Sequence, residues 1–262
     1  MADRTTPPTS DPWSQWRAAT RARVGLGRAG DATRLVDVLA FQHAHARARD
    51  AVHTPLDTEA LAREVSPHAC IHVQSRASDR STYLCRPDLG RRLDPECIGS
   101  LQHLAPDVVF IAADGLSAVA VQRHAATLFA ETKVRLPRWI IGPFIVATQA
   151  RVALGDEIGA LLGAAFCVVM IGERPGLSVA DGLGVYLTYG PRLGRADSER
   201  NCISNIQGGA AASGSGGLGI AAAAHKLAWL LNEGRRLGLT GIGLKDGAPV
   251  LEHNSSRIDG AT

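Results

Sequence analysis

Short, continuous apolar runs that alternate with helix-forming stretches constrain the fold of this chain more than any other feature. A helical pattern near residues 117–130 follows the apolar run at 107–112, and another near 155–163 follows the run at 143–148. Runs without polar alternation are typical of strands buried on both faces, as in a parallel sheet flanked by helices. The chain is therefore predicted to be an α/β protein with a Rossmann-like parallel sheet. The four runs are Asp107–Ala112, Pro143–Thr148, Ala165–Ile171 and Val185–Tyr189.

The sequence divides near residue 104. Residues 1–12 are expected to be a flexible tail, 13–104 a smaller, mostly helical region, and 105–262 the sheet domain. In the helical region, a 3.6-residue period predicts a helix over Asp31–Val52 whose apolar face, with His45, packs into the core. In the sheet domain, a long glycine-rich loop is expected from 190 to about 218, followed by a helix from Ile220.

Composition excludes several classes of protein. Apolar residues make up 45% of the 262 residues, which is too many for a disordered chain, and no run is long enough for a membrane helix. The net charge is +3 and the densest basic positions form pairs rather than blocks, which argues against a nucleic-acid partner. Five cysteines without zinc-type spacing indicate reduced thiols rather than a disulfide scaffold.

Two GxGxxG matches raise the question of a dinucleotide site. Gly25–Gly30 follows no strand pattern, so it lacks the strand–turn–helix context that such a site requires. Gly214–Gly219 does precede a helix, and this keeps a stand-alone NAD(P)-dependent oxidoreductase as an alternative. His43 and His45 would point apart on a helix, and the group His68, Cys70 and His72 lacks a fourth ligand, so no metal site is predicted.

Three polar or loop positions follow the predicted parallel strands. Asp114, Val152 and Glu173 stand just beyond three strand ends, where open α/β sheets bind ligands. Glu173 has glycines nearby that allow close approach of a ligand, although a surface pair with Arg174 or Arg192 is the competing interpretation. Cys202 lies among polar residues in the expected long loop, and a merely buried thiol is its competing interpretation.

The same segments carry a resemblance to a known family. PDLGRRL in 73–96, GERPGL in 170–192 and CISNI in 200–206, together with the tail 235–246, resemble the small (light) subunit of ethanolamine ammonia-lyase. The similarity extends from about residue 12 to the end of the chain.

The resemblance implies an adenosylcobalamin-dependent lyase that converts ethanolamine, a vicinal amino alcohol, to acetaldehyde and ammonia by radical chemistry. It implies a large TIM-barrel subunit that holds the substrate, a hetero-oligomer with several copies of each chain, and a cofactor between the two chains. The family's cofactor contacts map onto Val152, Glu173 and Cys202. No catalytic acid or base is assigned to this chain. Because a DxHxxG motif is missing, the cofactor is expected base-on, without a cobalt ligand from this chain.

The resemblance also bears on where the protein is located in the cell. The short polar segment Met1–Asp11 does not match the longer amphipathic leader that directs some family members into a bacterial microcompartment. A cytoplasmic enzyme is therefore the simpler expectation, with encapsulation through the partner as the alternative. Besides the oxidoreductase, a non-catalytic scaffold subunit is the third hypothesis.

Overall fold

The computed structural model describes residues 11–208 and 217–249, and its centre is a seven-stranded sheet in the order β3-β5-β4-β6-β7-β8-β9. Pairs β3–β5, β5–β4, β4–β6 and β8–β9 are parallel, whereas β6–β7 and β7–β8 are antiparallel. The predicted α/β class is confirmed, but the sheet is mixed rather than wholly parallel. The strands are β3 (Cys70–Gln74), β4 (Val108–Ala113), β5 (Ile141–Thr148), β6 (Phe166–Gly172), β7 (Leu183–Tyr189), β8 (Arg200–Gln207) and β9 (Leu218–Gly219).

Helices and a small ribbon complete the described part of the chain. The first segment carries α1 (Ser14–Ala19), the two-stranded ribbon β1 (Arg28–Ala29) and β2 (Ala32–Thr33), and α2 (Leu35–His53). The remaining α-helices are α3 (Thr58–Glu64), α4 (Arg80–Cys85), α5 (Ala118–Val134), α6 (Leu154–Leu162) and α8 (Ile220–Leu237). Four 3₁₀ turns are η1 (Leu89–Arg91), η2 (Pro95–Ser100), η3 (Asp197–Glu199) and η4 (Gly241–Gly243).

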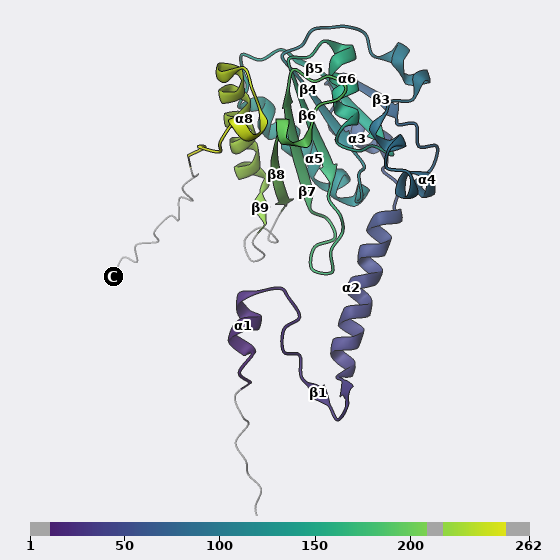
Figure 1. Cartoon of the computed structure of the whole chain (residues 1–262), viewed down its shortest axis with the longest axis vertical. Helices are drawn as coiled ribbons and strands as arrows, with labels where there is room; N and C mark the ends of the chain where they lie inside the picture. The colour runs from purple at the N-terminus through teal and green to yellow at the C-terminus, as the bar shows by residue number, and fades with distance from the viewer. Residues whose placement is uncertain (1–10, 209–216, 250–262) are drawn as a thin grey trace, which may run out of the picture.

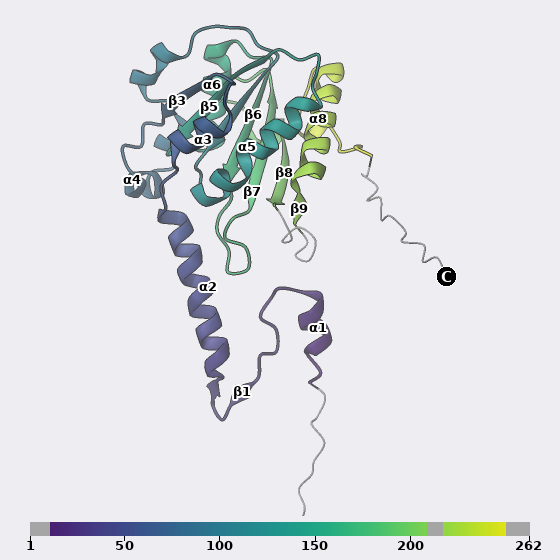
Figure 2. The ribbon, with the colours of Figure 1, turned by 180° about the vertical axis from the view of Figure 1, so that it is seen from behind.

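The sheet separates two hydrophobic layers. On one face α5 and α8 pack against alternate residues of β4 to β8, and Figure 2 shows α5 crossing that face. On the other face α6 packs against β4, β5 and β6. Among the described residues this second layer contains no side chain of β8 and only the half-buried Tyr186 of β7. The β7–β8 end of that face is therefore left without a helix over it.

The predicted strands and the helices between them are confirmed within one to three residues at most boundaries. Burial explains this agreement, because β4 and β6 are fully buried along their whole length and leave no polar alternation in the sequence. The sheet continues across residue 104, since β3 pairs in parallel with β5.

Two expectations are wrong. The loop predicted for 190–218 contains strand β8, which pairs with β7 from Leu183↔Ile206 to Thr188↔Arg200. The predicted core face of the helix over 31–52 is not buried in this chain, because Ala51 is the only buried residue of α2 and His45 is exposed. Figure 1 shows the reason: α2 leaves the sheet domain, and the segment before it lies apart from that domain.

Candidate functional site

Asp114 fixes the loop that follows β5. It comes directly after β4 and is buried, and its carboxylate accepts hydrogen bonds from the backbone N–H groups of Gln149 (2.8 Å) and Ala150 (3.0 Å). Arg80 lies 3.7 Å from the same carboxylate. Burial raises the pKa of Asp114, and the two amides and Arg80 act against this rise. Asp114 thus has a structural role, which is to position the residues that lead to Val152.

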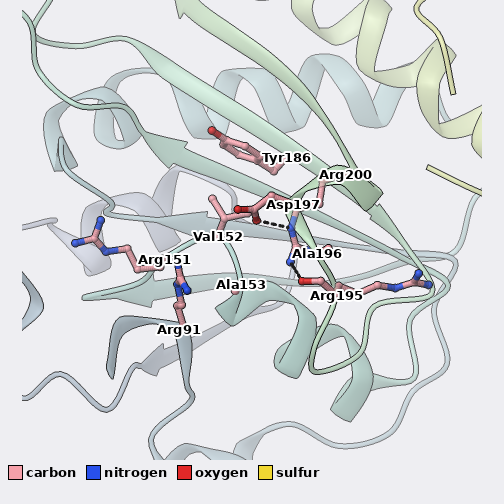
Figure 3. A pocket seen from close by; sticks show the side chains of 9 residues that line it. All are labelled: Arg91, Arg151, Val152, Ala153, Tyr186, Arg195, Ala196, Asp197 and Arg200. Atoms are coloured by element: carbon pink, nitrogen blue, oxygen red, sulfur yellow. Dashed lines mark hydrogen bonds and ion pairs between the residues drawn. The ribbon is translucent and has the colours of Figure 1, made fainter. Parts of the chain in front are cut away.

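Val152 lies in a cavity between the first turn of α6 and the loop before β8. The cavity has a volume of about 400 Å³, and Figure 3 shows Val152 among the side chains that line it. Its lining combines apolar surface with guanidinium groups, so it accepts a partly polar ligand of moderate size. The lining residues are Arg91, Arg151, Val152, Ala153, Tyr186, Arg195, Ala196, Asp197 and Arg200.

A buried ion pair lies beneath this cavity. Both guanidinium NH₂ groups of Arg200 donate to the carboxylate of Asp156 on α6, at 2.6 and 2.8 Å, and both side chains are almost fully buried. Arg200 also donates to the Thr188 hydroxyl of β7 (3.0 Å). The pair holds β8 against α6 and satisfies the charge of Arg200 within the protein.

At the other end of the cavity the positive charge is less compensated. Arg151 donates to the carbonyl of Tyr83 (3.3 Å), and its guanidinium carbon lies 4.3 Å from the centre of the Tyr83 ring. Its Nε is buried without a hydrogen-bond partner. Neither Arg151 nor Arg91 is within salt-bridge distance of a carboxylate among residues 11–208 and 217–249. This end of the cavity therefore favours a ligand with acceptor atoms or negative charge.

Glu173 follows β6 and reaches across to β8. Its carboxylate accepts hydrogen bonds from the Ser204 hydroxyl (2.6 Å) and from the N–H of Asn205 (3.1 Å). Gly184 makes room for it, because a Cβ at that position would lie 3.0 Å from Glu173 Oε1. No ion pair joins Glu173 to Arg174 or Arg192 in the described part of the chain. The carboxylate is thus held at the strand end, beside a second, shallow depression between residues 173 and 182.

Cys202 lies on β8 and not in a loop, with its side chain on the uncovered face of the sheet. It is exposed, so it is not the buried thiol of the competing interpretation. It lies directly opposite Tyr186 of β7 in the strand pair. Burial raises the pKa of Tyr186 to about 12, and partial desolvation of the thiol by neighbouring atoms raises the pKa of Cys202. Both groups are therefore neutral at physiological pH.

The structure brings the three predicted residues onto one strip of the molecule. Val152 and Tyr186 line the same cavity, Tyr186 contacts Cys202, and Glu173 lies over Gly184, two residues before Tyr186 on β7. Tyr186, Gly184 and Ser204 belong to this strip and were not identified from the sequence. Alternation was the available clue, because small or polar residues at every second position of β7 and β8 mark a sheet face without a helix over it.

The alternative sites gain no support from the described residues. Gly25–Gly30 lies between α1 and β2, away from any strand–helix turn, and Gly214–Gly216 of the second GxGxxG match lie outside the described residues. The His68 ring is 2.9 Å from the Gly142 carbonyl and packs on Phe129. No group of three or more His, Cys, Asp or Glu in the described chain could hold a metal ion. No helix there is long and apolar enough to span a bilayer.

The fold and the strip define an α/β protein that presents an open sheet face and a strand-end crevice to a ligand or another chain. Comparisons with known proteins identify its family. The model of the ethanolamine ammonia-lyase light chain family matches residues 10–245. The chain is 48% identical to the ethanolamine ammonia-lyase small subunit of Azotobacter vinelandii, over 100% of this chain and 96% of the relative.

Other relatives give the same result. The small subunit of Ralstonia nicotianae is 47% identical over 93% of this chain and 92% of the relative, and that of Rhodococcus erythropolis is 46% identical over 91% of each. The chain belongs to the ethanolamine ammonia-lyase light chain family. It is therefore a subunit of a carbon–nitrogen lyase, and the resemblance found in its sequence motifs is confirmed.

Proposed function

We propose that the chain is the small subunit of an adenosylcobalamin-dependent ethanolamine ammonia-lyase, which deaminates ethanolamine to acetaldehyde and ammonia together with a large TIM-barrel subunit. The observation that carries the proposal is the strip from Val152 to Glu173, an open sheet face beside a cavity in a member of this family. A corrin ring is flat, broad and edged with amide side chains, so it needs a flat surface with hydrogen-bonding groups at its rim.

The residues of the strip fit this ligand. Val152 supplies apolar contact from the cavity, and Cys202 supplies a compact neutral side chain on the open face. Glu173 keeps the acceptor capacity of its carboxylate beyond the two hydrogen bonds from β8, so it can orient amide groups of the corrin. Gly184 and Ser204 add little height to the sheet face, which leaves room for a ring.

The chemistry of the reaction comes from the cofactor. Adenosylcobalamin, when bound, supplies an adenosyl radical that removes a hydrogen atom from the substrate and later returns it. This chain contributes placement and the exclusion of water, and we assign it no catalytic acid or base. We further propose that cobalamin binds base-on, with no cobalt ligand from this chain.

The remaining parts of the proposal concern architecture and location. We propose that the β5-β4-β6 part of the sheet is a Rossmann-like unit, with the cofactor at its strand ends. We also propose a hetero-oligomer with several copies of each subunit in the cytoplasm. Cell fractionation distinguishes this location from enclosure in a bacterial microcompartment.

Reconstitution tests the function. We expect no turnover from this chain with ethanolamine and adenosylcobalamin, and formation of acetaldehyde once the large subunit of the same organism is added. Turnover by the isolated chain with NAD(P)H would instead support the oxidoreductase alternative. If the large subunit alone bound cobalamin as tightly as the complex of both subunits does, this chain would be a non-catalytic scaffold subunit.

A further inference from the structure

The N-terminal segment of residues 11–50, called the arm below, is folded, but within the described chain only its last turn, at Arg47 and Asp50, comes near the sheet domain. It contains α1, the β1–β2 ribbon and most of α2, and none of its residues is buried. Both ribbon views show it extending away from the sheet domain (Figures 1 and 2). Six of its large apolar side chains are exposed: Trp13, Trp16, Leu35, Val36, Leu39 and Phe41. A monomer rarely leaves such a surface open, so the arm is built to be covered.

The arm is fixed to the sheet domain at the edge that carries the proposed cofactor site. The first buried residue is Ala51, in the last turn of α2. Arg80 donates to the carbonyls of Val52 (2.6 Å) and Gly115 (2.8 Å), and it also pairs with Asp114 beyond the end of β4. The arm and the loop after β6 extend from the sheet in the same direction (Figure 1). A chain that met the cofactor at this edge would therefore lie next to the arm.

Charge indicates which partner covers it. The arm has seven arginines and four aspartates, a net charge of +3, while the rest of the chain has 21 basic and 21 acidic residues. A second copy of this chain offers no net negative charge, and two arms placed together would repel each other. The partner that fits is a different chain with an acidic surface and apolar patches for the exposed aromatic and aliphatic side chains.

We propose that the arm is a clamp that holds the large subunit, with its apolar side chains packed on that subunit beside the cofactor. This inference rests on the proposed function, because it takes the large subunit as the partner. It adds that a segment remote from the strip in sequence provides much of the affinity between the two chains. The strip then holds the cofactor and the arm holds the partner.

The test compares two triple variants of the full-length chain. The arm variant is Leu35→Gln, Val36→Gln and Leu39→Gln, at positions that are 70%, 64% and 55% exposed. The control variant is Val134→Gln, Ile140→Gln and Ile242→Gln, at positions that are 78%, 67% and 76% exposed. They lie at the end of α5, just before β5 and in η4, outside the arm and the strip. Circular dichroism verifies folding, binding to the large subunit is titrated, and light scattering gives the mass of each chain alone.

We expect the arm variant to bind the large subunit about a hundredfold more weakly than the wild type, because three buried aliphatic contacts are lost. The control variant should bind like the wild type. Unchanged binding by the arm variant, or an equal loss in the control, would overturn the clamp and leave the proposed function intact. If the wild-type chain alone is a dimer, and the arm variant is a monomer that still binds the large subunit fully, the arm instead contacts a second copy of this chain. Failure of the wild type to bind would contradict the proposed function itself.

Discussion

At the scale of single residues, the strip is built from side chains that the surrounding structure holds in place. Glu173 is oriented by two donors from β8, and Tyr186 lies directly opposite Cys202 in the β7–β8 pair. Asp114 touches none of these groups but sets the loop that carries Val152. This difference separates residues that would contact the cofactor from residues that position others, and each kind predicts a different experimental effect.

The substitution Glu173→Gln separates charge from shape. Glutamine keeps an oxygen that accepts from Ser204 and Asn205, so the loop should hold its conformation and the free energy of unfolding should change little. Loss of the charged acceptor should weaken cobalamin binding to the reconstituted complex roughly tenfold to a hundredfold. Absorption titration measures the dissociation constant. An unchanged constant would remove Glu173 from the cofactor site.

Cys202 should show an unusual pH dependence of its reactivity. Neighbouring protein atoms partly desolvate the thiol and raise its pKa, so the reactive thiolate is scarcer at pH 7 than it is for a free cysteine. Alkylation by iodoacetamide should be slow at neutral pH and should accelerate only at a more alkaline pH than it does for a free cysteine, and the Cys202→Ser variant should lose this phase. Peptide mass spectrometry of the labelled chain follows the site directly. Rapid labelling of Cys202 at pH 7 would contradict the described environment.

At the scale of secondary-structure elements, burial decided what could be predicted from the sequence. Strands β4 and β6 are buried on both faces and appear as continuous apolar runs, so they and the loops beyond them were predicted well. Strand β8 is only partly buried, with Cys202 and Ser204 exposed, so it leaves no continuous apolar run, and the glycines of residues 190–218 predicted a loop. Two of the three site residues were therefore placed at strand ends from the pattern alone, whereas the position of Cys202 on a strand required the structure.

The apolar periodicity of α2 led to the opposite error. Val38 and Phe41 mark an apolar face, and such a face normally packs on the chain's own core. In this chain that face is open, since α2 leaves the sheet domain. The sequence shows that a helix face will be covered, but it does not show which chain covers it.

The Asp156–Arg200 ion pair joins α6 to β8, so we expect its loss to lower the stability of the folded chain. Asp156→Asn removes the buried counter-charge of Arg200 and leaves only the exposed carboxylate of Asp197, 3.4 Å from Arg200 Nε. We expect the free energy of unfolding to fall by about 3 kcal/mol. The double variant Asp156→Leu and Arg200→Met removes both charges and should recover most of this loss. Urea unfolding of the three proteins measures the effect. Equal stability of wild type and Asp156→Asn would show that the pair is not structurally important.

At the scale of the whole molecule, the chain is one part of a larger enzyme. Its core is complete on the α5–α8 face, while the β7–β8 end of the opposite face and the arm remain open in the described residues. These two open regions have different characters. The strip is compact, largely neutral and close to a cavity, as a cofactor surface requires, whereas the arm is basic and rich in exposed apolar side chains, as a partner surface requires.

The central claim is that cobalamin lies on the open face of β7 and β8, and a bulky residue at Cys202 tests it most directly. The measurement is the dissociation constant of cobalamin for the reconstituted complex, by absorption titration, with Cys202→Trp compared with Cys85→Trp, a matched change at an exposed thiol on α4. An indole on the strip should clash with the ring and weaken binding roughly tenfold to a hundredfold, while Cys85→Trp leaves it unchanged. Equal dissociation constants for wild type and Cys202→Trp would contradict the account.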